Sequence, residues 1–183
     1  MKTSLKAAAA LSLSLVASGA VAAERTVMVG GAAMYPSKTI VDNAVNSKDH
    51  TTLVAAVQAA GLVDTLKGAG PFTVFAPTNA AFAKLPAGTV DNLVKPENKE
   101  TLTTVLTYHV VPGRMTAKDV AKAIKAGGGK ATLTTVQGGT LTASMMGNKI
   151  MLTDAKGGMS HVTQGDVLQS NGVIHVVDTV LMP

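Results

Sequence analysis

The spacing of apolar residues changes once along this 183-residue chain, near residue 130, and this change restricts the fold classes that fit the sequence. Before it, apolar side chains recur every three or four residues, which is typical of amphipathic helices. After it, they alternate with polar residues, which is typical of strands with one buried face. Turn signals rich in Gly and Asn divide this second part into hairpins. Helices followed by a meandering sheet predict an α+β fold.

The local patterns also predict where the elements lie. Helices are expected at residues 37–45, 51–60, 62–66, 78–84, 96–108 and 115–126, whereas residues 88–94 fit no clear period. Ser37 is the predicted N-cap of the first helix. Short strands are expected at residues 72–75 and 109–111, because both segments are rich in β-branched or aromatic residues. In the last hairpin, Asn171-Gly172 predicts a tight turn with positive φ at both central positions. We expect Phe75 and Ile174 in a single core.

The N-terminal residues have the pattern of a secretory signal peptide. Lys2 and Lys6 precede an uncharged stretch that ends in the small residues Ala20-Val21-Ala22. We therefore expect residues 1–22 to be removed, residues 23–36 to form a lead segment, and residues 37–183 to form one domain. The uncharged stretch is shorter than the roughly 20 apolar residues that a spanning helix needs. The expected location is the periplasm or the external medium, without membrane insertion.

The composition of the chain excludes disulfide bonds and disfavours nucleic acid as a partner. The chain has no cysteine, so no disulfide can stabilise it and its core must do so. Removal of the signal peptide leaves 14 basic and 11 acidic residues, a net charge of +3. The lysines are spread along the sequence, and none of the five aromatic residues follows Tyr108. These features disfavour nucleic-acid binding, which needs a basic surface or aromatic platforms for bases.

Motifs for catalysis are incomplete in this sequence. Residues 127–132 contain three glycines and a lysine but lack the leading Gly and the Ser or Thr of a phosphate-binding loop. No Gly-x-Ser-x-Gly motif is present. Ser160 and His161 are adjacent on an expected strand, so their side chains should point to opposite faces. His175 and Asp178 are likewise not an obvious catalytic pair. We therefore expect no enzymatic activity and no cofactor.

Three segments, in this order, carry a family resemblance. They are Gly-Pro-Phe-Thr-Val-Phe-Ala-Pro-Thr-Asn-Ala-Ala-Phe at residues 70–82, Tyr108-His109-Val110-Val111, and Asn-Gly-Val-Ile-His-Val-Val-Asp-Thr-Val-Leu-Met-Pro at residues 171–183. Together they resemble the FAS1 (fasciclin) domain family. The resemblance covers residues 37–183 and implies a wedge of two small β-sheets with several helices packed around one edge. It also implies a non-enzymatic role in cell adhesion or extracellular recognition.

The resemblance further implies a partner-binding site. In animal members of the family, an Asp-Ile pair before the last hairpin is linked to integrin binding, and Asp166 and Val167 align with it. The residues before Asp166 lack the polar and basic pattern of those members. The candidate site therefore comprises Asp166 and Val167, with Tyr108 and His109 of the Tyr-His motif. Each has a structural alternative, because Val167 can pack inward as a strand residue and His109 can be a half-buried packing residue.

The expected partner is a protein or a component of the cell envelope, bound by a monomer. A different class of function is a periplasmic binder of a small apolar molecule, using the gap between helices and sheet. The other alternative ligand is copper. Thioether and imidazole groups suit Cu(I), and five such residues fall within 17 positions: Met145, Met146, Met151, Met159 and His161. We favour a packing role for these methionines, because thioethers on hairpin strands commonly fill core space, and therefore expect no metal.

Overall fold

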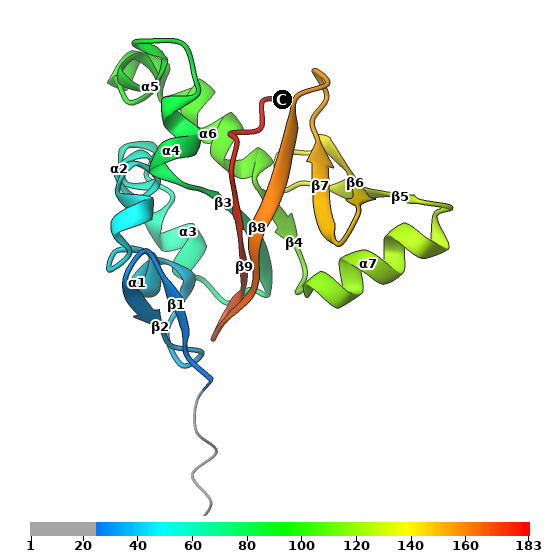
Figure 1. Cartoon of the computed structure of the whole chain (residues 1–183). Coiled ribbons are helices and arrows are strands. Elements are labelled where there is room, and N and C mark those ends of the chain that lie inside the picture. Colours follow the sequence, from blue (N-terminus) through cyan, green and yellow to red (C-terminus); the bar gives the residue numbers. More distant parts are fainter. Residues whose placement is uncertain (1–24) are drawn as a thin grey trace, which may run out of the picture.

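The computed structural model describes residues 25–183, and Figure 1 shows their arrangement. The predicted signal peptide, residues 1–22, lies outside the described residues. The strands are β1 (Val27–Val29), β2 (Ala32–Met34), β3 (Phe72–Pro77), β4 (Val110–Pro112), β5 (Lys130–Thr134), β6 (Thr140–Met146), β7 (Lys149–Thr153), β8 (Met159–Gln169) and β9 (Gly172–Val177). The α-helices are α1 (Ile40–Ala44), α2 (Thr51–Ala60), α3 (Val63–Lys67), α4 (Asn79–Ala83), α5 (Thr89–Leu93), α6 (Lys99–Tyr108) and α7 (Ala117–Ala126). Short 3₁₀ turns at Lys48–His50 and Pro96–Asn98 precede α2 and α6.

Seven strands form the main sheet, in the order β4-β3-β9-β8-β7-β6-β5. Strands β3 and β9 are parallel, and every other neighbouring pair is antiparallel. The long strand β8 pairs with β7 through its first residues and with β9 through the rest. It therefore belongs to two small sheets that diverge from it, with β5, β6 and β7 fanning away from β3 and β9 (Figure 1). This is the predicted α+β wedge.

The helices cover the two halves of the sheet differently. Helices α1 to α6 lie beside β3 and β9, whereas α7 runs under β5 and β6 (Figure 1). The buried apolar residues accordingly form two clusters. Ile174 is buried in the cluster beside α1 to α6, and Phe75 in the cluster under α7. Both residues are in the interior as predicted, but the expected single core is divided because β9 is buried on both faces.

Side-chain caps explain why several helices begin where they do. The Thr78 hydroxyl accepts a hydrogen bond from the Ala81 N–H at the start of α4. Thr116 and Asp119 form a reciprocal capping box at the start of α7. The predicted cap at Ser37 is wrong, because the Thr39 hydroxyl accepts from the Asp42 N–H and α1 begins at Ile40. Each cap satisfies a backbone donor that has no partner within its helix.

Three further features differ from the sequence-based expectations. The lead segment contains the β1–β2 hairpin, which buries Val29 and Met34. Residues 88–94 contain α5. In the last hairpin, Gln169 pairs with Gly172, so the turn is centred one residue earlier than predicted and lacks positive φ at Asn171 and Gly172. The reason is tertiary: Gly172 is paired closely with Phe72 of β3. No helix within residues 25–183 is long and apolar enough to cross a membrane.

Candidate functional site

Asp166 lies at an irregularity in β8. The register between β8 and β9 shifts on both sides of Gln164, and Asp166 has a φ of 57°, the left-handed conformation that Asp tolerates better than most residues. Its exposed carboxylate turns toward α7, where Oδ1 accepts a 2.6 Å hydrogen bond from the Ala117 N–H. A carboxylate at a helix N-terminus is favoured both by the unpaired N–H groups and by the helix dipole.

His175 lies beneath Asp166 and connects the same three segments. Its Nδ1 accepts a hydrogen bond from the Asp166 N–H at 3.4 Å, and its Nε2 lies 2.8 Å from the Met115 carbonyl oxygen. The ring stacks on Phe75 with a centroid separation of 5.6 Å. Burial lowers the pKa of His175, although the Met115 carbonyl and the Asp166 charge oppose this. The neutral ring is therefore a link between β9, the bulge and the start of α7, which the sequence did not reveal.

Val167, the second residue of the predicted pair, points inward. It pairs with Ile174 and is fully buried among residues of the core beside α1 to α6. This is the structural alternative that the sequence left open. Asp166 and Val167 point to opposite sides of β8. A partner that docks on the folded domain can therefore contact Asp166 but not Val167.

Tyr108 is also fully buried. Its hydroxyl donates to the Thr140 carbonyl oxygen at 2.7 Å and accepts from the Ala155 N–H at 3.0 Å. Burial raises the pKa of the phenol, so the hydroxyl keeps its proton as a donor. The tyrosine thus fixes the end of α6 to the start of β6 and to the turn after β7.

His109 connects the end of α6 to the C-terminal segment. Its Nδ1 lies 2.7 Å from the Val105 carbonyl oxygen, and its Nε2 accepts from the Leu181 N–H at 2.9 Å. Burial lowers the pKa of His109 to about 4, so the ring is neutral at pH 7. The Tyr-His motif and Asp166 have no hydrogen-bond partner in common, and the two residues of the motif serve in packing.

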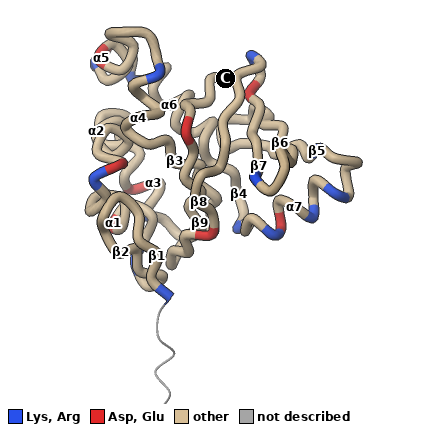
Figure 2. Tube along the Cα trace, viewed as in Figure 1, with Lys and Arg blue, Asp and Glu red and all other residues tan. Residues whose placement is uncertain are grey.

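A basic surface that sequence analysis missed begins next to Asp166. Lys118, Lys122 and Lys125 are exposed on α7 at spacings of four and three residues, which place them on one side of the helix. We call these three residues the lysine face. Arg114 and Lys130 are exposed just before and just after the helix, and Figure 2 shows basic positions along this edge of the molecule. The helical spacing of the three lysines was the available sequence signal.

The lysine face is supported by the packing of α7 and has no ion-pair partner among residues 25–183. The opposite side of α7 buries Val120 and Ile124 against the sheet. Within residues 25–183, no carboxylate forms an ion pair with Lys118, Lys122 or Lys125. Asp119 is on the same helix, and its carboxylate is hydrogen-bonded to Thr116, which lowers its pKa; the charges of Lys122 and Lys118 lower that pKa further, but neither lysine forms an ion pair with it. The surface is thus suited to an acidic partner.

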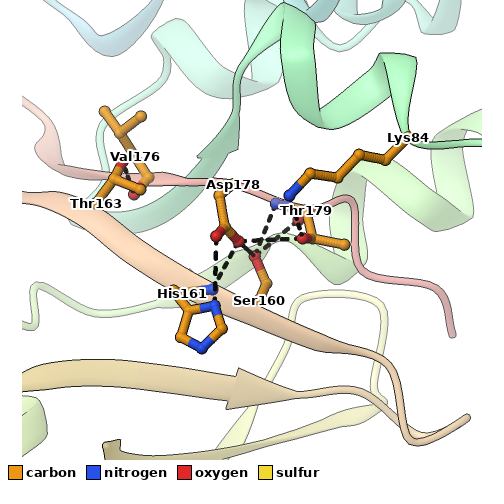
Figure 3. A network of polar contacts seen from close by, with 7 residues as sticks. All are labelled: Lys84, Ser160, His161, Thr163, Val176, Asp178 and Thr179. Carbon is orange, nitrogen blue, oxygen red and sulfur yellow. Dashed lines mark hydrogen bonds and ion pairs between the residues drawn. The ribbon is translucent and has the colours of Figure 1, made fainter. Parts of the chain in front are cut away.

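A second polar network joins β8 to the residues that follow β9 (Figure 3). The buried Ser160 hydroxyl donates to the Thr179 carbonyl oxygen at 2.9 Å, with Asp178 Oδ1 at 3.4 Å. His161 Nδ1 lies 3.3 Å from Asp178 Oδ2. Ser160 and His161 therefore both contact Asp178, but their side chains form no hydrogen bond with each other. Among the described residues, no imidazole accepts a hydrogen bond from the Ser160 hydroxyl, so the serine–histidine contact of a catalytic triad is absent there.

The methionines near this network are not core residues. Met145, Met146 and Met159 are exposed, and Met151 is half-buried. The expectation that they fill core space is wrong for this reason. The buried face of these strands is instead formed by smaller or branched residues: Ala143, Ile150, Leu152 and Val162.

Comparison with known proteins agrees with the architecture. The family model described as the Fasciclin domain matches residues 48–183. The chain belongs to the Fasciclin domain family. Protein sll1483 of Synechocystis sp. is 46% identical over 160 residues, which cover 87% of this chain and 82% of that protein. Immunogenic protein MPB70 of Mycobacterium bovis is 41% identical, covering 76% of this chain and 66% of its own length.

Two other matches extend the comparison to animals. Transforming growth factor-beta-induced protein ig-h3 of Sus scrofa is 32% identical over 81% of this chain, which corresponds to 20% of its own length. The solved structure of a FAS1 domain pair from the insect cell adhesion molecule Fasciclin I matches with a TM-score of 0.72 at 19% identity. That match covers 81% of this Fasciclin-family chain and 52% of the domain pair, and it shows the shared fold.

Proposed function

We propose that this chain is an exported, non-enzymatic recognition module that binds an acidic partner at the cell envelope through the lysine face of α7. The observation that carries the proposal is the exposed, unpaired set of Lys118, Lys122 and Lys125 on a helix whose other side is buried. Charges held in fixed positions attract an acidic surface without a further cost of ordering the helix. The partner is a protein or another envelope component.

Asp166 has a positioning role in this proposal. Its hydrogen bond to Ala117 orients the first turn of α7, and thereby the direction in which the lysine face points. The site implied by the family resemblance thus adjoins the proposed surface. The names of two similar proteins are consistent with a location outside the cell. One is a cell surface glycolipoprotein of Mycobacterium bovis, and the other is the insect cell adhesion molecule whose solved structure matches this chain. The module acts as a monomer.

Charge reversal tests the surface directly. The processed chain is incubated with isolated bacterial envelopes, and bound protein is measured by co-sedimentation at several salt concentrations. The triple variant Lys118→Glu, Lys122→Glu and Lys125→Glu should bind at least tenfold more weakly. Binding of the unaltered protein should also fall as salt screens the charges.

A control triple with the same change in charge separates the lysine face from net charge. Lys48, Lys95 and Lys99 are exposed elsewhere on the domain, and their replacement by Glu should leave most of the binding intact. Equal loss in the two triples, or full binding by the α7 triple, would contradict the proposal. Thermal melting of both triples confirms that each is folded.

Export requires a separate measurement. Intact-mass analysis of the protein recovered outside the cytoplasm should give a chain that begins near Ala23, because Ala20-Val21-Ala22 precedes it. An unprocessed chain in the soluble exported fraction would contradict the predicted signal peptide.

An apolar cavity supports a second candidate function, the binding of a small hydrocarbon. It has a volume of about 60 Å³ and lies between α1, α2, α3, α6 and the sheet, with walls that are almost entirely apolar. Its lining includes Ile40, Leu53, Val57, Leu66, Val74 and Leu106. A larger apolar cavity, of about 150 Å³, stays dry and binds benzene or xenon, and of these two the smaller xenon suits the present volume. Xenon under pressure should raise the melting temperature if the cavity binds ligand, and Val57→Leu should reduce that effect by filling space. An unchanged melting temperature would exclude this function.

A further inference from the structure

Two methionines and a histidine lie together on the solvent-facing side of β7 and β8. Met151 is directly opposite His161 in the register of these strands, so both side chains project from the same face. Met159 is two residues before His161 on β8, which places it on that face as well. Opposite pairs have Cβ atoms about 5 Å apart, and diagonal neighbours about 7 to 8 Å, which is within reach of long side chains.

The other two methionines of the sequence cluster do not neighbour His161. Met145 pairs with the buried Ile150, so it projects toward the α7 side of the sheet. Met146 pairs with Lys149, so it lies on the same face as Met151 and diagonal to it, but on β6, two strands away from His161. The set in which each member neighbours His161 or lies on its own strand is therefore Met151, Met159 and His161. Met159 is 56% exposed, so its thioether is accessible from solvent and is not required for packing.

The imidazole of His161 is held in place by a carboxylate. Asp178 Oδ2 lies 3.3 Å from His161 Nδ1, and Asp178 Oδ1 accepts a 2.9 Å hydrogen bond from the His161 N–H. Thr179 also donates its hydroxyl to Asp178 at 3.1 Å. A carboxylate beside one ring nitrogen favours a proton there and leaves the other nitrogen as a free electron-pair donor. Figure 3 shows that the other nitrogen of His161 faces away from Asp178.

We propose that Met151, Met159 and Nε2 of His161 form a binding site for Cu(I). Two thioethers and one imidazole are a soft ligand set, which selects Cu(I) over harder divalent cations. Within residues 25–183, no group of three or more His, Asp or Glu residues is placed to hold a metal ion, so a hard-ligand site is absent from this part of the chain. The Asp178–His161 contact is the outer-shell arrangement typical of metal-binding histidines.

Competition with a Cu(I)-specific chelator under anaerobic conditions tests the site. The processed chain should retain one Cu(I), whereas Met151→Leu and Met159→Leu should each weaken retention at least tenfold. Met145→Leu is the matched control, because it makes the same change on the opposite face, and it should retain copper as the unaltered protein does. Asp178→Asn should weaken retention by about 10- to 100-fold, the range typical of outer-shell partners.

Three outcomes would overturn the proposal. The first is that the unaltered chain retains no stoichiometric Cu(I). The second is that Met145→Leu and Met151→Leu lose Cu(I) retention equally. The third is that the chain retains Zn(II) as well as it retains Cu(I). Leucine has a similar volume to methionine, Met159 is exposed and Met151 is only half-buried, so the two ligand variants should fold normally. Thermal melting checks this for each variant. The methyl NMR signals of Met151 and Met159 should shift on addition of Ag(I), a redox-inert probe of the same soft class, while that of Met145 stays in place.

Discussion

The Asp166 carboxylate accepts a 2.6 Å hydrogen bond from the Ala117 N–H and so joins the bulge of β8 to the first turn of α7. Asp166 holds this position with a φ of 57°, and it is the non-glycine residue with positive φ among residues 25–183. The bulge and the helix start are therefore coupled. A change at Asp166 acts on the orientation of α7 as well as on the local surface.

Removal of the Asp166 carboxylate should reveal this coupling. Asp166→Ala loses the acceptor for Ala117 and places a residue poorly suited to positive φ at the bulge, so it should lower the free energy of unfolding by about 1 to 2 kcal/mol. Asp166→Asn retains an acceptor and tolerates the positive φ, so it should lower the free energy of unfolding by less than Asp166→Ala does. Urea denaturation measures both. Equal destabilisation by the two variants would show that the hydrogen bond is not the reason.

Val167 should behave as a core residue in the same experiments. Because its side chain is fully buried, Val167→Ala should lower the free energy of unfolding by roughly 2 kcal/mol through lost burial and a small cavity. Envelope binding by the folded variant should be unchanged, since a partner does not reach this side chain. Loss of binding with an unaltered denaturation midpoint would instead place Val167 in the contact surface.

The two buried signature residues can be tested together. Phe75→Ala should cost roughly 3 to 5 kcal/mol and Ile174→Ala roughly 2 to 5 kcal/mol, the usual range for large-to-small changes in a core. The two residues lie in different apolar clusters, so each variant tests the packing on a different face of the sheet. Calorimetric unfolding provides the comparison, and an unchanged midpoint in either variant would contradict its placement.

His109 should make the domain less stable in acid. Its pKa is about 4 in the folded protein against an ordinary 6.5, so the unfolded chain binds more protons between these values. The contribution is fully present above about pH 6.5 and is lost as the pH falls toward about 4, by roughly 3 kcal/mol in total. His109→Gln should flatten this part of the stability profile. His50 and His175, whose pKa values are also lowered by burial, act in the same direction.

The measurement compares urea midpoints at pH 7 and pH 4.5 for the unaltered chain and His109→Gln. A difference between the two pH values that is the same in both proteins would contradict the assignment. The variant also removes the acceptor of the Leu181 N–H, so its stability at pH 7 provides the reference.

Gly172 should tolerate no side chain. A Cβ at this position would lie 2.0 Å from the Phe72 carbonyl oxygen of the paired strand, and the backbone cannot yield easily there. Gly172→Ala should therefore lower the free energy of unfolding by about 3 kcal/mol. Gly147→Ala is the comparison, because its Cβ would meet open space and only the positive φ of 62° opposes it. A smaller effect at Gly172 than at Gly147 would contradict the close approach.

The sequence by itself determined the local elements and the fold class. The apolar period, Gly61 after α2, Thr78 before α4 and the turn residues between the later strands act over a few positions, so their effect can be read without the rest of the chain. The motif at residues 70–82 and the Tyr-His pair also identified the family, and Tyr108 and His109 proved to be packing residues of that fold.

Only the tertiary structure decided which faces are covered and which residues meet. Alternation places Met151 and His161 on one face of their strands, but the packing of α7 against the other face is what keeps this face out of the core, so both residues are only half-buried. The pairing of Phe72 with Gly172 shifts the last turn, and the bulge brings Asp166 to Ala117. These contacts join residues far apart in the chain. Local propensity carries no information about them, because their stability depends on burial shared by elements that form independently.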